Sequence, residues 1–273
     1  MYMKPYTKTE ENILKEHYSL TGVSGVQKYI KRSADSIRHK AKSLGITRKV
    51  GFRHSNLNLD EFYVKITPNG AYFLGLLWGD GNLKINKRHN SISITLQEKD
   101  FNNLRYIFNK FHIHKVKKKK QSWQQCFKAY IGHFDFATFL FENDYVEKST
   151  LSPYKILSFI KDKYHHYFLR GWFDADGACN ELPKGKYHIS LSGSFNQDWT
   201  AFTRLCENLD IKTRIYFANA KNGNKSSHVS IIGFNNIIRF RDFLYSGKKI
   251  GLDRKRNKFY SIRPPLREGA LNP

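Results

Sequence analysis

The sequence has few cysteines, few acidic residues and no long apolar run. Its three cysteines, Cys126, Cys179 and Cys206, lie far apart and lack Cys-x-x-Cys spacing, which argues against a disulfide framework and favours reduced thiols inside a cell. The eleven histidines show neither helical His-x-x-x-His nor zinc-finger spacing, so no soft-metal site is expected. We expect a cytoplasmic protein in a bacterial or phage setting, with an organelle as the alternative.

The shortage of acidic residues leaves a large positive charge. Against 47 Lys and Arg there are 23 Asp and Glu, which gives a formal net charge of +24 over 273 residues. An excess spread along the chain favours a polyanionic partner, because released counterions drive association with phosphates. A membrane surface is the competing polyanion, but the sequence has no signal peptide, lipidation motif or apolar span of membrane length. The length suits two or three small domains.

Two short apolar stretches that both end in Asp-Gly lie at 71–81 and 164–177. Each is too short to span a bilayer, so each is predicted to form a buried helix. Small residues four apart would let the two helices pack at close range, and these pairs are Gly75/Gly79 and Gly171/Ala175.

The acids that close these stretches, Asp80 and Asp176, conflict with helix electrostatics. The glycines that follow, Gly81 and Gly177, suit the left-handed residue that ends a helix, which places each carboxylate at the negative end of the helix. A carboxylate is unfavourable there unless a cation compensates it, and such conflicts often mark functional sites. Asp-Gly is also a common turn pair, and this plainer alternative weakens when two copies share one context.

Residues 1–47 are predicted to form a small unit of three helices. Thr7 and Glu10 have capping-box spacing at the start of the first helix. Ser24 would cap a short second helix that carries Val26, Tyr29 and Ile30. A third would begin at Ser33, bury Ile37, Ala41 and Leu44, and end at Gly45.

The outer face of the third helix is basic and carries Arg38, His39, Lys40 and Lys42. Segment 32–46 resembles the last helix of the Myb/SANT-like helix-turn-helix modules. The resemblance implies a DNA-binding module whose last helix enters the major groove. A basic bundle used for protein contacts is the alternative.

After a basic linker at 48–67, one order of elements occurs twice. Behind Asp80 the pattern predicts, in turn, a hairpin within 82–97, a helix from Asp100, a hairpin from 115–120 and 123–131, and a helix from Asp135. Behind Asp176 it predicts a hairpin to Ser192, a helix from about 196 to 209, a hairpin from 212–216 and 228–232, and a helix at 235–245. An internal repeat is therefore expected.

This repeat predicts an α+β fold of two pseudo-twofold-related α-ββ-α-ββ-α units with antiparallel, saddle-shaped sheets, preceded by the small all-α N-terminal domain. The units are expected at 68–150 and 164–247, joined by a linker at 151–163. A basic tail would follow at 248–273.

Each sheet would have helices on one face and polar residues on the other. A single polar residue of this kind is usually just a wet strand position, but two basic sheets that flank one pair of acids suit the base edges and phosphates of nucleic acid. The residues expected on the polar faces are Asn82, Lys84, Asn86, Ser91, Ser93, Thr95, Gln97, Lys117, Lys119, His188, Ser190, Lys212, Arg214, Tyr216, His228 and Ser230.

The two apolar stretches contain LRGWFDADG at 169–177 and, more loosely, FLGLLWGDG at 73–81. With the repeated order behind each copy, residues 65–260 resemble a LAGLIDADG homing endonuclease of the single-chain, two-motif kind. The first copy departs from the motif at Trp78, where Asp or Glu is usual. We expect this departure to affect the packing of the helices rather than the chemistry.

The resemblance implies a site-specific endonuclease that makes a magnesium-dependent double-strand break in a long, asymmetric double-stranded DNA, works as a monomer without a membrane, and serves intron mobility. It implies that Asp80 and Asp176 bind two or more divalent cations. An RNA maturase or intron-splicing factor and a non-cleaving DNA-binding regulator are the alternatives on the same fold. The auxiliary residues implied beside the metal sites are Gln97 or Asp100 with Lys148 in the first unit, and Ser192 with Lys255 in the second.

Overall fold

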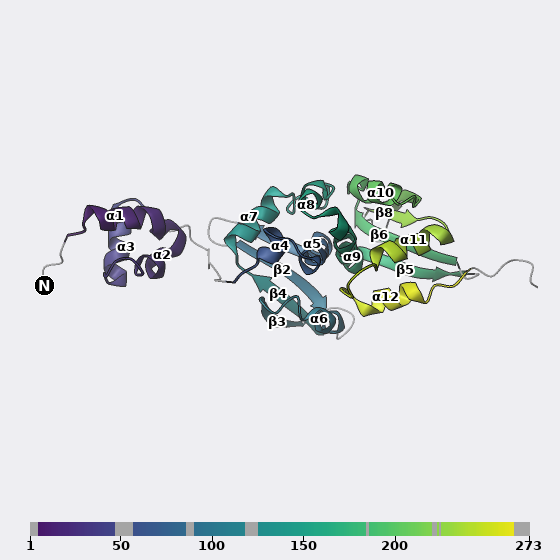
Figure 1. The fold of residues 1–273 in the computed structure, drawn as a ribbon, viewed down its shortest axis with the longest axis horizontal. Coiled ribbons are helices and arrows are strands. Elements are labelled where there is room, and N and C mark those ends of the chain that lie inside the picture. Colours follow the sequence, from purple (N-terminus) through teal and green to yellow (C-terminus); the bar gives the residue numbers. More distant parts are fainter. Residues whose placement is uncertain are drawn as a thin grey trace, which may run out of the picture.

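The computed structural model describes residues 5–46, 57–85, 90–117, 125–183, 186–219, 223 and 225–264. A set of N-terminal helices is followed by two units in which helices cover antiparallel sheets (Figure 1). Within these ranges, no helix is long and apolar enough to cross a membrane.

The N-terminal helices begin as the capping signals predict. The Thr7 hydroxyl accepts a hydrogen bond from the Glu10 amide, and the Glu10 carboxylate accepts one from the Thr7 amide, which completes the capping box. The third helix follows a Ser33 cap and ends before Gly45, whose φ is +69°. The helices here are α1 (Lys8–Ile13), a π-helical turn (Leu14–Tyr18), α2 (Ser19–Val26) and α3 (Ala34–Ser43).

The second helix begins close to its expected start. Gly22, whose φ is 66°, is not helical and separates the end of the first helical stretch from a short segment that ends at Val26. This agrees with a short second helix from about Ser24, and Val26 and Ile30 enter the core of the N-terminal unit. Tyr29 lies beyond α2 with 60% of its surface exposed, and it stacks on His17 with ring centroids 4.5 Å apart.

The two units repeat one order of elements. The first contains α5 (Pro68–Asp80), β1 (Gly81–Ile85), β2 (Asn90–Gln97), α6 (Glu98–Leu104), β3 (His112–Lys117), β4 (Gln125–Ile131) and α7 (Phe134–Glu142). The second contains α9 (His165–Asp176), β5 (Gly177–Leu182), β6 (Lys186–Ser194), α10 (Thr200–Glu207), β7 (Thr213–Asn219), β8 (Lys225–Ile231) and α11 (Phe234–Leu244). The strand orders β1-β2-β4-β3 and β5-β6-β8-β7 are equivalent and all pairs are antiparallel, which confirms the predicted α+β repeat.

The central helices α5 and α9 lie side by side between the two sheets (Figure 1). Strand register relates the units, because Gly81 pairs with Ile94 just as Gly177 pairs with Leu191. Alternate residues of each sheet face the helices and enter one large core. The other residues form a face that the helices do not cover, called the open face below.

Three short helices fall in segments that were expected to be a linker or a tail, namely α4 (Asp60–Tyr63), α8 (Tyr154–Ser158) and α12 (Asp253–Tyr260). Each contributes to the large core a residue that is almost fully buried: Phe62, Ile156 and Phe259. Each helix is too short to show a helical period in the sequence. Burial of a large apolar side chain is worth enough to hold so short a helix against the core.

Candidate active site at the ends of the central helices

The two central helices touch backbone to backbone. A Cβ atom added to Gly75 of α5 would lie 1.9 Å from the Phe168 carbonyl oxygen, and one added to Gly171 of α9 would lie 2.0 Å from the Tyr72 carbonyl oxygen. A carbon atom needs about 3.3 Å to an oxygen, so only glycine fits at either position. The predicted close contact through small residues is confirmed.

This contact brings the two acids together. α5 ends at Asp80 and α9 ends at Asp176, and a Cβ atom on Gly79 would lie only 2.7 Å from Asp176 Oδ2. Burial, together with the neighbouring Asp80 carboxylate, raises the pKa of Asp176 from its ordinary 3.8 to about 6. Asp176 is therefore still mainly ionised at pH 7, and two carboxylates share the end of the helix pair.

The glycines after the acids do not adopt the expected left-handed conformation. Gly81 has φ −72° and ψ 152°, and Gly177 has φ −79° and ψ 146°, so each helix passes straight into an extended strand. A Cβ atom would lie 2.4 Å from the carbonyl oxygen of Leu77 or Phe173, respectively. Glycine is needed here because the strand leaves so close to the last helical turn, and each acid consequently lies directly before a strand.

A lysine lies against the carboxyl end of each central helix. The Lys148 ammonium donates to the carbonyl oxygens of Leu77 and Gly79 at 2.8 Å and of Gly81 at 2.7 Å. The Lys255 ammonium donates to the carbonyl oxygens of Phe173 and Gly177, both at 2.7 Å. These are the cations that the acids at the negative helix ends require. The carbonyl partners were not predictable, because each lysine is between 67 and 82 residues from them in sequence.

Both lysines remain cationic near neutral pH. Burial lowers the pKa of Lys148 and of Lys255 to about 8, while Asp176 and Asp80 raise both values. An ammonium group has three N–H donors, and Lys148 uses all three on backbone carbonyls. In this conformation, Lys148 acts on a nearby anion through its charge rather than through a direct hydrogen bond.

The auxiliary residues expected beside the acids are placed differently in the two units. Gln97 is half-buried at the end of β2, where it precedes α6. Asp100 is buried and accepts two hydrogen bonds of 2.7 Å from Arg254 of α12, so it forms an ion pair between the units. By register the counterpart of Gln97 is Ser194 rather than Ser192, because each lies three residues beyond the partner of the closing glycine.

The open faces carry most of the polar residues expected on them. The strand register of the second sheet puts its expected polar residues on one face, where the side chains of His188, Tyr216 and His228 are partly exposed to solvent. Lys212 lies just before β7 and is exposed, while Asn86 and Lys119 lie outside the described residues. The expected residues that register assigns to the open faces are Asn82, Lys84, Ser91, Ser93, Thr95, Gln97, His188, Ser190, Arg214, Tyr216, His228 and Ser230.

The exception is β3, where the expected alternation is reversed. His112 pairs with Tyr130 and His114 with Lys128, and all four are in phase with the open-face residues of β2. Position 117 pairs with Gln125 and is out of phase with them, so the expectation for Lys117 is wrong. The error comes from starting the strand at residue 115, because the run of lysines obscured the alternation that begins at His112.

Paired rings on the open faces replace the lysines expected there. Tyr130 stacks on His114 with ring centroids 5.0 Å apart, and Tyr216 stacks on His228 at 4.9 Å. Ser192 and His228 are linked by a hydrogen bond of 3.0 Å. These groups donate, accept and stack, which are the contacts that read the edges of bases.

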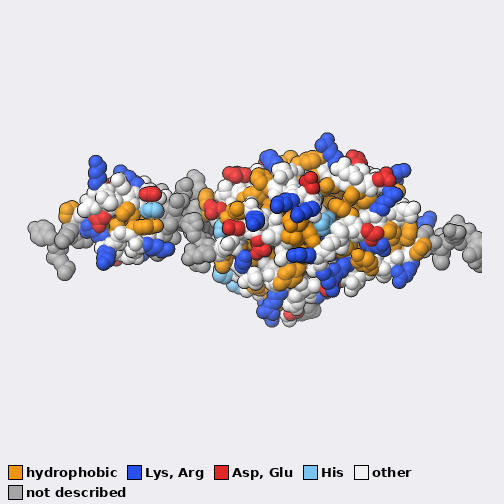
Figure 2. All heavy atoms as spheres, viewed as in Figure 1, with side chains coloured by type: hydrophobic (Ala, Val, Ile, Leu, Met, Phe, Trp, Pro, Cys, Tyr) orange, Lys and Arg blue, Asp and Glu red, His pale blue; other side chains and the backbone are white. Residues whose placement is uncertain are grey.

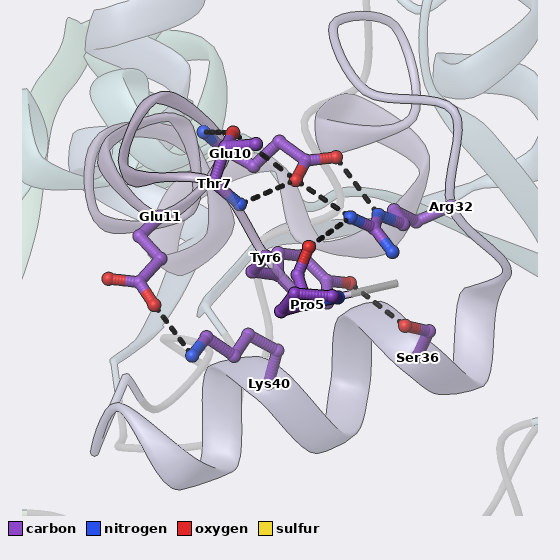
Figure 3. Close-up of polar contacts among 8 residues, drawn as sticks. All are labelled: Pro5, Tyr6, Thr7, Glu10, Glu11, Arg32, Ser36 and Lys40. Carbon is purple, nitrogen blue, oxygen red and sulfur yellow. Dashed lines mark hydrogen bonds and ion pairs between the residues drawn. The ribbon is translucent and has the colours of Figure 1, made fainter. Parts of the chain in front are cut away.

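The basic face of α3 is narrower than expected. Lys40 turns back toward α1 (Figure 3), where its ammonium lies 2.6 Å from the Glu11 carboxylate and 5.6 Å from the centre of the Tyr6 ring. Arg38 and Lys42 are exposed one turn apart on another side of the helix. Lys40 is therefore a contact inside the N-terminal unit, and the expectation that it faces outward is wrong.

Trp78 confirms the expectation that the departure from the motif concerns packing. Its side chain is 3% exposed, and its ring lies 5.1 Å from that of Tyr145 and 6.4 Å from those of Phe168 and Trp172. It thus fills the space between α5, α9 and the segment that leads to Lys148.

Comparison with known families and structures agrees with this arrangement. The sequence model of the LAGLIDADG-like domain family matches residues 163–244. The matched range is the second unit, from the start of α9 to the end of α11. A search of curated proteins found no match to the chain.

Solved structures of homing endonucleases are similar to this chain at low sequence identity. The homing endonuclease I-WcaI bound to its DNA recognition sequence is 15% identical with a TM-score of 0.51, and the match covers 75% of this chain and 93% of that one. Mesophilic variants of the homing endonuclease I-DmoI are 16% identical with a TM-score of 0.44, covering 66% of this chain and 97% of that one. A variant of I-DmoI in complex with its target DNA in the presence of magnesium is 14% identical with a TM-score of 0.42, covering 66% and 97%.

Proposed function

We propose that this protein is a site-specific DNA endonuclease that makes a metal-dependent double-strand break in a long, asymmetric target. The observation that carries the proposal is the meeting of Asp80 and Asp176 at the joined ends of α5 and α9, next to the open faces of two sheets. The LAGLIDADG-like match of residues 163–244 supports it, as does the fold shared with a homing endonuclease bound to DNA.

The donor atoms at the seam fit magnesium. The seam offers two carboxylates, and magnesium typically takes one or two carboxylates and fills its other positions with water and phosphate oxygens. The raised pKa of Asp176 reflects burial beside a second carboxylate, and a cation between the acids would relieve that repulsion. When bound, magnesium supplies polarisation of the phosphodiester and an activated water.

The chain's own residues bind and orient the DNA. Open-face cations and hydroxyls hold phosphates and base edges of the duplex, so that one scissile phosphate of each strand lies beside the acids. Lys148 and Lys255 keep positive charge at the two helix ends, where it stabilises the charge that develops on the phosphates. Because both units are in one chain, a monomer suffices for both strands.

The asymmetry of the target follows from the differences between the open faces. By register, His114 and Lys128 of the first sheet occupy the places of Tyr216 and His228 in the second. Side chains that differ in charge and hydrogen bonding prefer different base pairs. Arg38 and Lys42 of α3 would add phosphate contacts beyond the sheets and lengthen the site.

Cleavage of a random or genomic DNA library in magnesium, followed by sequencing of the ends, tests the proposal. The wild type should cut both strands at one recurring sequence and stop when the metal is chelated. Asp80→Asn and Asp176→Asn should each reduce double-strand cleavage at least a thousandfold while binding persists, on the scale typical of essential catalytic groups. Asp60→Asn, a change of an exposed acid on α4, is the matched control and should cut normally. Binding without cleavage by the wild type would instead favour a regulator or, with RNA, a maturase.

A further inference from the structure

Each central helix has one buried residue, at the equivalent position, that contacts the chain segment leading to the lysine of its unit. Trp78 and Asp174 each lie three residues before the closing glycine of their helix. Both are buried, at 3% exposure, and both contact the residue that lies three before the lysine of their unit. Those residues are Tyr145 before Lys148 and Leu252 before Lys255.

In the second unit the contact is polar. Asp174 Oδ2 accepts a hydrogen bond of 2.7 Å from the Leu252 amide and one of 2.8 Å from the Tyr72 hydroxyl. Leu252 directly precedes α12, which bears Lys255. The loop approaches so closely that a Cβ atom on Gly251, whose φ is +114°, would lie 2.7 Å from the same oxygen. Asp174 thus fixes where α12 begins.

Arg170, one helical turn before Asp174, holds the rest of the same segment. It is 0% exposed and donates to the carbonyl oxygens of Leu244 at 2.6 Å and Ser246 at 2.7 Å. It also donates to those of Lys248 at 2.9 Å and Ile250 at 3.0 Å. The chain from the end of α11 to α12 is therefore tied to α9 along its whole length.

In the first unit the contact is aromatic. The Trp78 and Tyr145 rings meet edge to face at 5.1 Å, and the Tyr145 hydroxyl donates to the Leu74 carbonyl oxygen at 2.5 Å. Leu74 precedes Trp78 by one helical turn, as Arg170 precedes Asp174. Lys148 follows Tyr145 by three residues and reaches the end of α5.

We infer that the Tyr72–Asp174 pair and the Trp78–Tyr145 pair are positioning residues that hold Lys255 and Lys148, respectively, at the helix ends; this rests on the proposed function. Tyr72 belongs to α5, the helix that ends in Asp80, yet it serves the lysine at the end of α9. The proposed function places one scissile phosphate of each strand beside the acids, and we assign one lysine to each phosphate, so the two pairs should control cleavage of different strands.

Strand-resolved cleavage of a duplex labelled on both strands tests the inference with two matched changes. Tyr72→Phe and Tyr145→Phe each delete one buried hydroxyl and keep the ring. Tyr72→Phe should slow the strand that Lys255→Met slows, and Tyr145→Phe the strand that Lys148→Met slows, each by roughly tenfold, because small displacements at a reaction centre are costly. Asp174→Asn keeps an oxygen acceptor for the Leu252 amide. It should therefore retain more cleavage than Asp174→Leu of the DNA strand that Lys255→Met slows.

General loss of stability would lower both rates together and leave their ratio unchanged. If Tyr72→Phe slows both strands equally, or the strand assigned to Lys148, the inference is wrong. NMR of the free protein with isotope-labelled lysine gives a second readout that needs no cleavage. The Lys255 side-chain signal should shift in Tyr72→Phe but not in Tyr145→Phe, and an unshifted signal would overturn the inference. A wild type that cuts no DNA would count against the proposed function alone.

Discussion

Replacement of Gly75 by alanine tests the contact that joins the two units. The added Cβ would lie 1.9 Å from the Phe168 carbonyl oxygen, with two further backbone atoms of Phe168 within 3.0 Å. Because backbone cannot rotate away, the helices would have to separate by roughly 1.4 Å to restore an ordinary carbon–oxygen distance of about 3.3 Å. Overpacking costs about 1–3 kcal/mol, more where nothing can yield, and the better helix propensity of alanine returns about 1 kcal/mol.

A net loss of about 2 kcal/mol should lower the melting temperature by roughly 4–8 °C in a chain of this size. The assay is thermal unfolding at fixed protein concentration, followed by circular dichroism. Gly132→Ala is the control, since its added Cβ would meet only the Asn90 carbonyl oxygen, at 3.3 Å, and should shift the midpoint by less than about 2 °C. Equal midpoints for Gly75→Ala and the wild type would refute the close backbone contact.

Three further predictions concern charges. The pKa of Asp176 is about 6 in the folded protein and 3.8 ordinarily, so the folded state binds the proton more tightly than the unfolded state. The metal-free protein should therefore gain stability as the pH falls from about 6 to 4. Thermal melts in chelator should show this trend, and Asp176→Asn should weaken it. Arg254→Met leaves the buried Asp100 carboxylate without its ion-pair partner and should lower the free energy of unfolding by roughly 2 kcal/mol. The loss is smaller than for a fully buried pair because Arg254 is 45% exposed. Adding Asp100→Asn in a double-mutant cycle should recover part of this loss. Lys42→Ala should weaken DNA binding and reduce the salt dependence of the binding constant by about one counterion. Lys40→Ala breaks the ion pair with Glu11, so it should lower stability and leave the salt dependence of binding unchanged.

Much of the architecture was predictable because it follows from periodicity. The change from helical spacing to alternation after Asp80 and again after Asp176 predicts both the boundary and the repeat. Glycines four apart predict a helix contact at backbone distance, and the structure has it at Gly75 and Gly171. These signals are local, so a single sequence is enough to recognise them.

The errors arise where a particular contact, and not periodicity, decides. Gly81 could be glycine because of a positive φ or because of crowding, and only the position of Leu77 shows that crowding is the reason. Lys40 belongs to a basic helix face, but the position of Glu11 on another helix turns it inward. The phase of β3 depends on pairing with β4 rather than on its own run of lysines. For Lys40 and β3 the deciding neighbour lies on another element, whereas for Gly81 it lies in the preceding helical turn and matters only because the strand starts directly after the helix.

The candidate site was predicted as two acids, and the structure adds the cations that make the acids tolerable there. A carboxylate at a helix carboxyl end is repelled by the last carbonyl groups, and a buried ammonium bonded to those carbonyls reverses the local potential. Lys148 does this for α5 and Lys255 for α9. Near the acids, the two units therefore share a buried lysine bonded to the carbonyl groups at the end of the central helix. Tryptophan can stand where the other copy has Asp174, because a ring packed on Tyr145 holds the lysine segment in place as a carboxylate bonded to an amide does in the other copy.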